Sequence, residues 1–333
     1  MQTISKMTMK RIAKAKNKFN IFIEEAPIPK ISHTEVLIKA KYTLISRGSE
    51  IWRRYVRPEA IQQKMMGYCL TGEIVKTGDL VQSFSVGDKV AAVAPHSEFV
   101  SVDTNSKNLT PSIVKLPDEI ELKEGTFWPL STSAVLWVNE ISKLITINDQ
   151  IITIMGQGLV GSLIMQVALS QRPKKIIAVD TISYRCKLAK ELGSHFVINS
   201  SENSLIDNIN KITNEKKSNV VIEAVGGPGG KNAFKDSLKI VSQDGIIQVI
   251  GLYENEPLQF NSGEIQGKKI IGGFSTNTDR KWASNQALKL ISEKSIQPKK
   301  MISHNFHYTE ASTAFEMLYE NISNLMGVVF NWD

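Results

Sequence analysis

The chain has 333 residues, of which 42% are hydrophobic and 22% charged, so it is long enough for two domains of ordinary soluble-protein composition. It has no run of about 18 apolar residues and no apolar h-region in its lysine-rich N-terminus, so we expect neither membrane insertion nor secretion. The formal net charge of +7 suits an anionic cofactor or substrate, but the basic residues are too dispersed to predict a nucleic-acid partner.

The cysteine content indicates where the protein works. Cys69 and Cys186 are the two cysteines, and they lie far apart in unlike contexts. This usage is typical of a reducing compartment, which predicts a cytoplasmic location. It also excludes a disulfide framework and any zinc site built mainly from cysteines.

The first third of the chain predicts a β-rich region, from Lys10 to about Asp118. Short apolar segments with strand-like composition recur between turn signals such as Gly78-Asp79 and Gly87-Asp88. The strand-like segments cover residues 21–23, 35–40, 72–75, 89–93 and 98–102.

The clearest motif follows Asp149. An apolar run at 151–155, rich in β-branched residues, leads directly into a G-x-G-x-x-G made by Gly156, Gly158 and Gly161. A helical pattern then runs from Leu159 to Leu169, and a second apolar strand at 175–179 ends on Asp180. A strand, glycine turn, helix and strand with a terminal acid predict a dinucleotide-binding unit.

Each residue of this unit has a physical task. Gly156 allows a tight turn, Gly158 lets the backbone approach a pyrophosphate, and Gly161 allows close helix–strand packing. The helix N-terminus, at Leu159 and Val160, directs free N–H groups at the phosphates. Asp180 is placed to accept hydrogen bonds from the adenosine ribose, which favours NAD(H) over NADP(H), although Arg185 lies close enough in sequence to affect that preference.

After Asp180 the pattern alternates helix and strand, which predicts an α/β fold with a doubly wound parallel sheet. Ligands bind at the carboxyl ends of such strands, so we expect the loops at Ala224, Val225, Gly251 and Tyr253 to face the cofactor. The last part of the chain predicts helices at 282–292 and 311–321 and a strand at 326–330, which we expect to return to the first domain.

The whole chain resembles the medium-chain dehydrogenase/reductase superfamily, whose best-known members are zinc alcohol dehydrogenases. The matching pieces are residues 36–38, 67–78, 86–90, 96–100 and 115–118, the glycine unit and 302–304. The piece Ser46-Arg47-Gly48-Ser49-Glu50 is most similar to a zinc-less branch that includes bacteriochlorophyllide dehydrogenases.

The resemblance implies a GroES-like catalytic domain, residues 1–123 and 280–333, and a Rossmann domain, residues 124–279. It implies a nicotinamide cofactor at the base of a cleft between the domains, with Thr132 among its contacts, and a homodimer or homotetramer. Zinc-dependent members bind the catalytic metal through a Cys, a G-H-E motif and a later Cys or acid. This chain has Arg47, then Tyr68 with Cys69, and Trp128 at those positions, and it lacks the four-cysteine lobe, so we predict no zinc.

Without a metal, hydrogen-bond donors must stabilise the developing alkoxide. Ser49 matches the hydroxyl residue that contacts substrate oxygen in the zinc enzymes, and Arg47 could supply fixed positive charge. Tyr68 could exchange a proton if that charge lowered its pKa. His96 is a weaker candidate.

Each candidate residue also has a purely structural interpretation. Ser49 could cap a short helix, Arg47 could pair with Glu50, and Tyr68 could be core. The stretch 52–57 mixes aromatics and cations, and could bind an acidic or planar substrate or form a solvated helix face.

The sequence therefore predicts a zinc-independent NAD(H)-dependent oxidoreductase that transfers hydride between nicotinamide and a small alcohol or ketone. An enoyl reductase of the same superfamily and a non-catalytic cofactor-binding scaffold remain as alternatives.

Overall fold

The structure is a computed structural model, and it describes residues 8–105, 111–252, 257–274, 280–321 and 323–333. The chain divides into two compact units. The first comprises Met1–Thr132, Asp279–Ser292 and Ile302–Asp333, and the second comprises Ser133–Thr278 and Glu293–Met301. The domain bounds expected from the sequence stay a prediction.

The first unit is built mainly on antiparallel strands, with one parallel pair, β14 and β15. Its main sheet has the order β14-β15-β3-β4-β5-β7, with β6 also paired to β3, and β1 and β2 form a separate hairpin. The bounds are β1 Thr8–Lys14, β2 Ile21–Pro27, β3 Glu35–Leu44, β4 Leu70–Thr77, β5 Lys89–Ala92, β6 Phe99–Asp103, β7 Ile113–Lys115, β14 Ile302–His307 and β15 Gly327–Asn331. Since β15 pairs antiparallel with β3, the last strand joins the first sheet, as expected.

Short helical segments link β3 to β4 and carry two of the candidate catalytic residues, Arg47 and Ser49. They are α1 (Arg47–Glu50), the π-helix η1 (Ile51–Tyr55) and the 3-10 helix η2 (Gln63–Met65). The buried side chains of Ile51 and Tyr55 join the core of this unit, in which α10 (Ala311–Glu320) also packs. Because Ile51 and Tyr55 anchor the apolar face of these helical segments in the core, polar residues of the same segments lie at the edge of the core.

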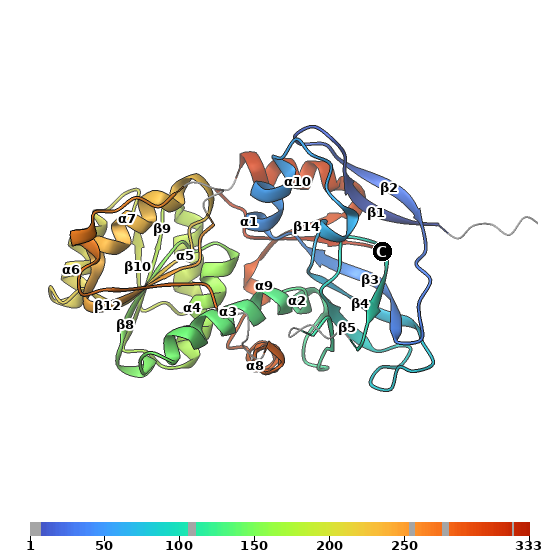
Figure 1. Cartoon of the computed structure of the whole chain (residues 1–333), viewed down its shortest axis with the longest axis horizontal. Coiled ribbons are helices and arrows are strands. Elements are labelled where there is room, and N and C mark those ends of the chain that lie inside the picture. The colour runs from blue at the N-terminus through green and yellow to red at the C-terminus, as the bar shows by residue number, and fades with distance from the viewer. Residues whose placement is uncertain (1–7, 106–110, 253–256, 275–279, 322) are drawn as a thin grey trace, which may run out of the picture. The chain divides into compact units, whose positions relative to one another are not determined.

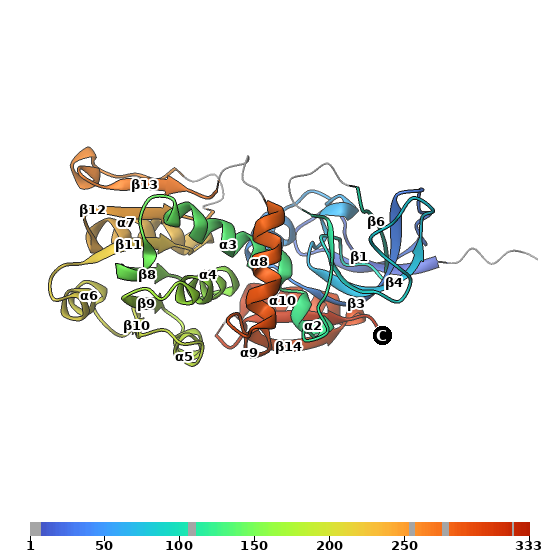
Figure 2. The same ribbon diagram turned by 90° about the horizontal axis from the view of Figure 1, so that it is seen from below.

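The second unit is a doubly wound parallel sheet. Its order is β10-β9-β8-β11-β12-β13, and Figure 2 shows the strands in this sequence. Renumbered from β8, this is the order 3-2-1-4-5-6 that is typical of dinucleotide-binding folds, and it confirms the predicted fold class. The bounds are β8 Ile151–Met155, β9 Lys175–Asp180, β10 Phe196–Asn199, β11 Ser218–Glu223, β12 Val241–Val249 and β13 Lys269–Gly272.

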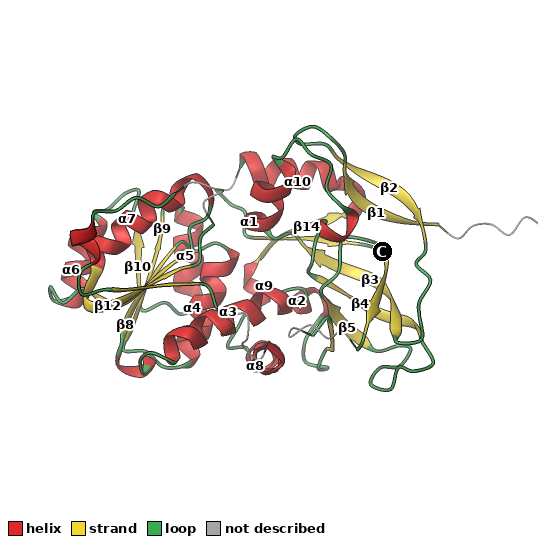
Figure 3. Ribbon diagram, in the orientation of Figure 1, coloured by secondary structure: helices red, strands yellow, loops and turns green. Residues whose placement is uncertain are grey.

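Helices cover both faces of this sheet. In Figures 1 and 3, α4 and α5 lie on one face and α6 and α7 on the other. The helices of this unit are α4 Leu159–Ser170, α5 Ser183–Glu191, α6 Leu205–Thr213, α7 Gly230–Ile240 and α9 Pro298–Met301, and α3 Trp128–Ser142 begins in the first unit and continues into the second. Helices α2 Leu122–Gly125 and α8 Arg280–Ser292 belong to the first unit. None of the helices in the described part of the chain is long and apolar enough to cross a membrane.

Candidate active site

The glycine loop after β8 has the geometry that its sequence predicts. Gly156 has φ +88°, and a Cβ there would lie 2.8 Å from Cγ2 of Val225. A Cβ on Gly161 would lie 1.8 Å from the carbonyl oxygen of Gly156, so helix α4 can approach the loop only because residue 161 is glycine.

Gly158 lies beside open space. The nearest atom to an added Cβ is Nη1 of Arg185, at 3.9 Å. Gly158 is also the N-cap of α4 and has no side chain to cap the N–H groups of the first turn, which includes Leu159 and Val160. An open backbone at a helix N-terminus fits the pyrophosphate of a dinucleotide.

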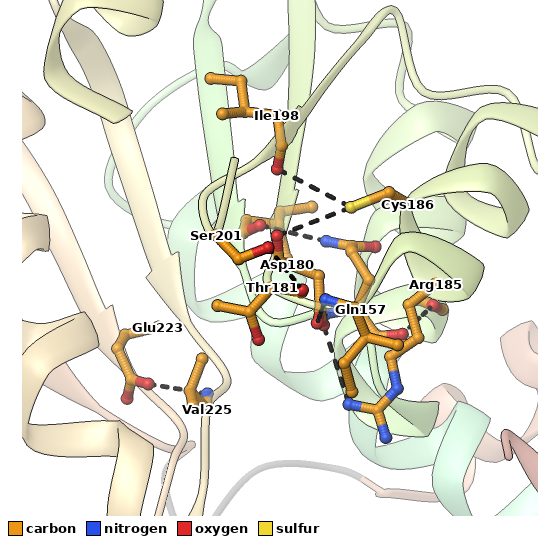
Figure 4. Close-up of polar contacts among 12 residues, drawn as sticks. Gln157, Asp180, Thr181, Arg185, Cys186, Ile198, Ser201, Glu223 and Val225 are labelled. Carbon is orange, nitrogen blue, oxygen red and sulfur yellow. Dashed lines mark hydrogen bonds and ion pairs between the residues drawn. The ribbon is translucent and has the colours of Figure 1, made fainter. Parts of the chain in front are cut away.

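Asp180 ties the glycine loop to the end of β9. Its side chain is buried, its Oδ2 accepts a hydrogen bond from the N–H of Gln157 at 2.7 Å, and its Oδ1 accepts one from Ile182 at 2.9 Å. Nη1 of Arg185 lies 3.8 Å from Oδ2, as Figure 4 shows. The carboxylate is thus held in place by main-chain donors, with a cation beside it. The sequence did not indicate the Gln157 contact, because any residue at that position donates the same N–H.

A second loop lies beside the glycine loop at the carboxyl ends of β11 and β12. Glu223, fully buried at the end of β11, accepts a hydrogen bond from the N–H of Val225 at 2.7 Å (Figure 4). Gly251 packs against the carboxylate of Glu223, since a Cβ on residue 251 would lie 2.6 Å from Oε2 of Glu223. The structure therefore brings Val225, Gly251 and Gly156 together, and Ala224 donates its N–H to Met155 O at 2.9 Å.

One residue that the sequence analysis missed and two predicted cofactor contacts remain to be placed. Glu223 was missed, although a charge at the end of an apolar strand was a usable signal. Tyr253 lies outside the described residues. Thr132 belongs to the first unit, is buried, and donates its hydroxyl hydrogen to Trp128 O at 2.9 Å, so its role towards the cofactor stays a prediction.

In the first unit, three hydroxyls form a chain. The hydroxyl of Tyr68 donates to Oγ of Ser46 at 2.5 Å and lies 3.4 Å from Oγ of Ser49. Burial, with a smaller contribution from Cys69, raises the pKa of Tyr68 far above its ordinary value, and the hydrogen bonds to the two serines only partly oppose this. Proton exchange by Tyr68 was made conditional on a pKa lowered by Arg47, and this condition is not met, because burial dominates and raises the pKa. Tyr68 is therefore a neutral hydroxyl, and Ser46 is a neighbour that the sequence did not single out.

His96 joins the two loops that carry these hydroxyls. Its Nε2 lies 2.8 Å from Oε2 of Glu50, and both side chains are fully buried. Oε1 of Glu50 accepts a hydrogen bond from the N–H of Ser46 at 2.8 Å. On the other loop, the N–H of His96 donates to Met66 O at 2.6 Å, and a Cβ on Gly67 would lie 2.7 Å from the imidazole ring. This position favours support of the loops over direct contact with substrate.

Arg47 is fixed by other contacts. Its Nε donates to Leu318 O at 2.9 Å, and its guanidinium carbon lies 5.5 Å from the centre of the Trp52 ring. Both carboxylate oxygens of Glu50, the partner considered from the sequence, are engaged by Ser46 and His96. Arg47 thus connects α1 to α10 and to the π-helix.

The donors at the family's zinc positions do not fit a catalytic zinc ion. Arg47 and Tyr68 offer a guanidinium and a neutral phenol, and Trp128 is fully buried with its Nε1 donating to Ser284 Oγ at 3.0 Å. Zinc sites need thiolate, imidazole or carboxylate ligands. Among the described residues, no group of three or more His, Cys, Asp or Glu side chains is placed to hold a metal.

Comparisons with known proteins agree with this fold. The family model described as zinc-binding dehydrogenase matches residues 160–293. L-threonine 3-dehydrogenase of Pectobacterium atrosepticum is 23% identical over 355 residues, covering 98% of this chain and 94% of that protein. Sorbitol dehydrogenase of Halalkalibacterium halodurans is 25% identical over 339 residues, covering 93% and 96%.

A solved structure adds the three-dimensional comparison. A short chain alcohol dehydrogenase from Escherichia coli CFT073, complexed with NADH, matches with a TM-score of 0.83 at 21% identity, covering 98% of this chain and 99% of that one. The family model, the relatives matched along nearly their whole length and the fold therefore agree, and the chain is similar to medium-chain dehydrogenases of the zinc alcohol dehydrogenase type.

Proposed function

We propose that this protein is a nicotinamide-dependent dehydrogenase that interconverts a small alcohol and its ketone without a catalytic zinc ion, and that it prefers NAD(H). The coarser part follows from the similarity to medium-chain dehydrogenases, because the relatives of the chain are named dehydrogenases of threonine and sorbitol. The absence of zinc from the reaction and the cofactor preference are our inference.

The observation that carries the metal-free proposal is the hydroxyl chain of Ser49, Tyr68 and Ser46. These hydroxyls lie on the two loops where zinc-dependent relatives hold the metal, and they are linked at 3.4 and 2.5 Å. Dehydrogenation of an alcohol removes a hydride from carbon and a proton from oxygen. A bound nicotinamide supplies the hydride chemistry, so the side chains must handle the proton.

A chain of neutral hydroxyls can do this. Because Tyr68 donates to Ser46, its oxygen is free to accept from Ser49. Ser49 can then accept the proton of the substrate alcohol while each hydroxyl passes its own proton to the next, and one proton leaves from Ser46 to water. The same donors stabilise the alkoxide as it develops, and such a donor is typically worth about 3–4 kcal/mol. No tyrosinate is needed, which agrees with the burial that keeps Tyr68 protonated.

The cofactor side rests on the glycine loop and Asp180. Gly158 and the first turn of α4 would hold the pyrophosphate, and the carboxylate of Asp180 would accept hydrogen bonds from the adenosine ribose. A 2′-phosphate at that place would meet the charge of Asp180, whereas Arg185 would attract it. Asp180 is held by two main-chain N–H groups, which favours its carboxylate as the deciding group.

Turnover by the purified protein tests the activity. We expect NADH formation from NAD⁺ with one or more members of a panel that includes L-threonine, sorbitol and other secondary alcohols, and NADH oxidation with the matching ketones. Oxidation of NADH by enones alone would identify an enoyl reductase. Cofactor binding without turnover of any panel member would identify a scaffold.

A further inference from the structure

Arg54 is a half-buried cation whose position the proposed mechanism does not use. It lies in the π-helix η1, and the residue before it in the chain, Arg53, is exposed. Nη1 of Arg54 is buried and has no hydrogen-bond partner among the described residues. Single π-helical turns occur frequently at functional sites, where they displace side chains from the regular helical pattern.

Two other shielded cations of the same unit, Lys14 and Arg47, have partners. Nζ of Lys14, which is 2% exposed, donates to the carbonyl oxygens of Ala15, Asn17 and Glu59 at 3.1, 3.0 and 2.8 Å. Arg47 donates to Leu318 O and lies over the Trp52 ring. A guanidinium cannot lose its proton to escape the cost of burial, so an unpaired one requires an acceptor from elsewhere.

Arg54 lies on the same helical segment as Ser49, because η1 directly continues α1 and residue 54 follows residue 49 by about one turn. Burial and the Glu50 carboxylate raise the pKa of the Cys69 thiol well above its ordinary value, and the positive charge of Arg54 opposes them. Cys69 directly follows Tyr68. Glu50 lies one helical turn before Arg54, but its two oxygens are taken by Ser46 and His96, at 2.8 Å each.

A second unpaired donor lies on the segment that leads to Tyr68. Nε2 of Gln63, on η2, is buried and has no partner among the described residues. The amide can present either its nitrogen or its oxygen, since the two are assigned from their surroundings. The two segments that lie between Ser49 and Tyr68 in the chain, η1 and η2, therefore each carry a buried donor that lacks an acceptor among the described residues.

We propose that Arg54 binds an oxyanion, a carboxylate or phosphate, carried by the same substrate molecule whose alcohol meets Ser49. This rests on the proposed function, and it names the substrate class as anionic alcohols. Guanidinium groups match carboxylate and phosphate oxygens with paired hydrogen bonds, which fixes the orientation of the ligand.

Binding of small anions tests this without a known substrate. Thermal unfolding is measured with inorganic phosphate and with malonate, at ionic strength held constant with sodium chloride. We expect both anions, or the one that matches the substrate, to raise the unfolding temperature of the native protein and of Arg53→Gln. Arg54→Gln should lose the increase. Arg53→Gln is the matched control, because it removes the same charge from the exposed neighbouring position.

The unfolding temperature without added anion separates binding from structure. Because Arg54 is unpaired, Arg54→Gln and Arg54→Met should be at least as stable as the native protein, whereas an arginine that braces the fold would lower stability on removal. NADH affinity should be unchanged in all variants.

Three results would overturn the proposal. They are equal anion-dependent increases in Arg54→Gln and the native protein, a marked loss of stability in both Arg54 variants, and loss of NADH affinity in Arg54→Gln, which would assign the group to the cofactor. None of these readouts requires turnover. The proposed dehydrogenase activity can therefore fail while anion binding holds, and the reverse is also possible.

Discussion

At the scale of single residues, the carboxylate of Asp180 has two roles. We propose that it binds the ribose, and it is already hydrogen-bonded to the main chain at Gln157 and Ile182. A side chain fixed in this way loses little conformational entropy when a ligand arrives, so its hydrogen bonds contribute fully to affinity. Arg185 is the residue that competes with this preference, at 3.8 Å from the same carboxylate.

We expect NADH to bind more tightly than NADPH, by roughly 1.5–3 kcal/mol if charged hydrogen bonds to the ribose form. Titration of tryptophan fluorescence with both cofactors measures the difference. Arg185→Gln should increase it, because it removes the cation that attracts a 2′-phosphate. Equal affinity for the two cofactors in the native protein would show that Asp180 serves only the loop.

The hydroxyl chain predicts a specific kinetic result. Ser49→Ala should lower kcat by about 10²-fold or more, with NADH affinity unchanged, because a donor at the substrate oxygen is lost. Tyr68→Phe should lower kcat as well. Since the pKa of Tyr68 is raised far above 10, the phenol stays protonated at lower pH, and its removal should not delete any ionisation from the pH profile of kcat.

The measurement uses an alcohol from the panel that the native protein oxidises, with Ser101→Ala as a control for a serine outside the chain of hydroxyls. If Ser49→Ala turned over substrate normally, the proton would have to pass by another route. A kcat ionisation that disappears in Tyr68→Phe would show that tyrosinate forms.

At the scale of elements, the glycine loop and helix α4 offer a matched pair of substitutions. Gly158→Val should leave the free energy of unfolding nearly unchanged and abolish cofactor binding, because the new side chain enters space that the protein leaves open. Gly161→Val should lower the free energy of unfolding by at least about 1–3 kcal/mol, because its Cβ would overlap the Gly156 carbonyl. Denaturant unfolding and NADH titration separate the two effects. Normal NADH binding by Gly158→Val would place the pyrophosphate elsewhere.

The sequence was sufficient to predict those helices and strands that have a clear hydrophobic periodicity or a distinctive residue composition. The β8–α4–β9 unit combines buried apolar strands with glycines whose spacing has a mechanical reason, so its position was predictable. Strand β14 was not predicted as a strand, because its polar residues gain order only by pairing with β15. The π-helix at 51–55 was not predicted, since the same composition suits an ordinary helix.

Contacts between distant residues were the part of the site that the sequence could not supply. Glu50 and His96 are 46 residues apart, and nothing in either local sequence selects one as the partner of the other. From spacing alone, the nearer residue Arg47 was the reasonable partner for Glu50. The direction of the Tyr68 pKa shift could not be predicted either, because burial depends on which segments fold over the ring.

At the scale of the whole molecule, the matched family model indicates zinc binding, whereas the side chains of the candidate site do not favour it. The family model is described as a zinc-binding dehydrogenase, whereas the side chains at the metal positions are Arg47, Tyr68 and Trp128. We expect the purified protein to contain far less than one zinc per chain. Prolonged chelation should leave turnover and unfolding temperature unchanged, because no ligand set depends on the metal. Stoichiometric zinc, together with loss of activity on chelation, would contradict the metal-free mechanism.

The pairing of the last strand with β3 has a consequence for synthesis of the chain. The first unit includes residues 302–333, so its sheet cannot acquire β14 and β15 until nearly the whole chain has left the ribosome. Nascent chains usually fold from the N-terminus, one domain after another. Here the second unit is complete by Met301, so it should be the first to reach its native state, while the N-terminal strands wait with unpaired edges. Those strands, rather than the dinucleotide-binding sheet, are where chaperones should bind the emerging protein.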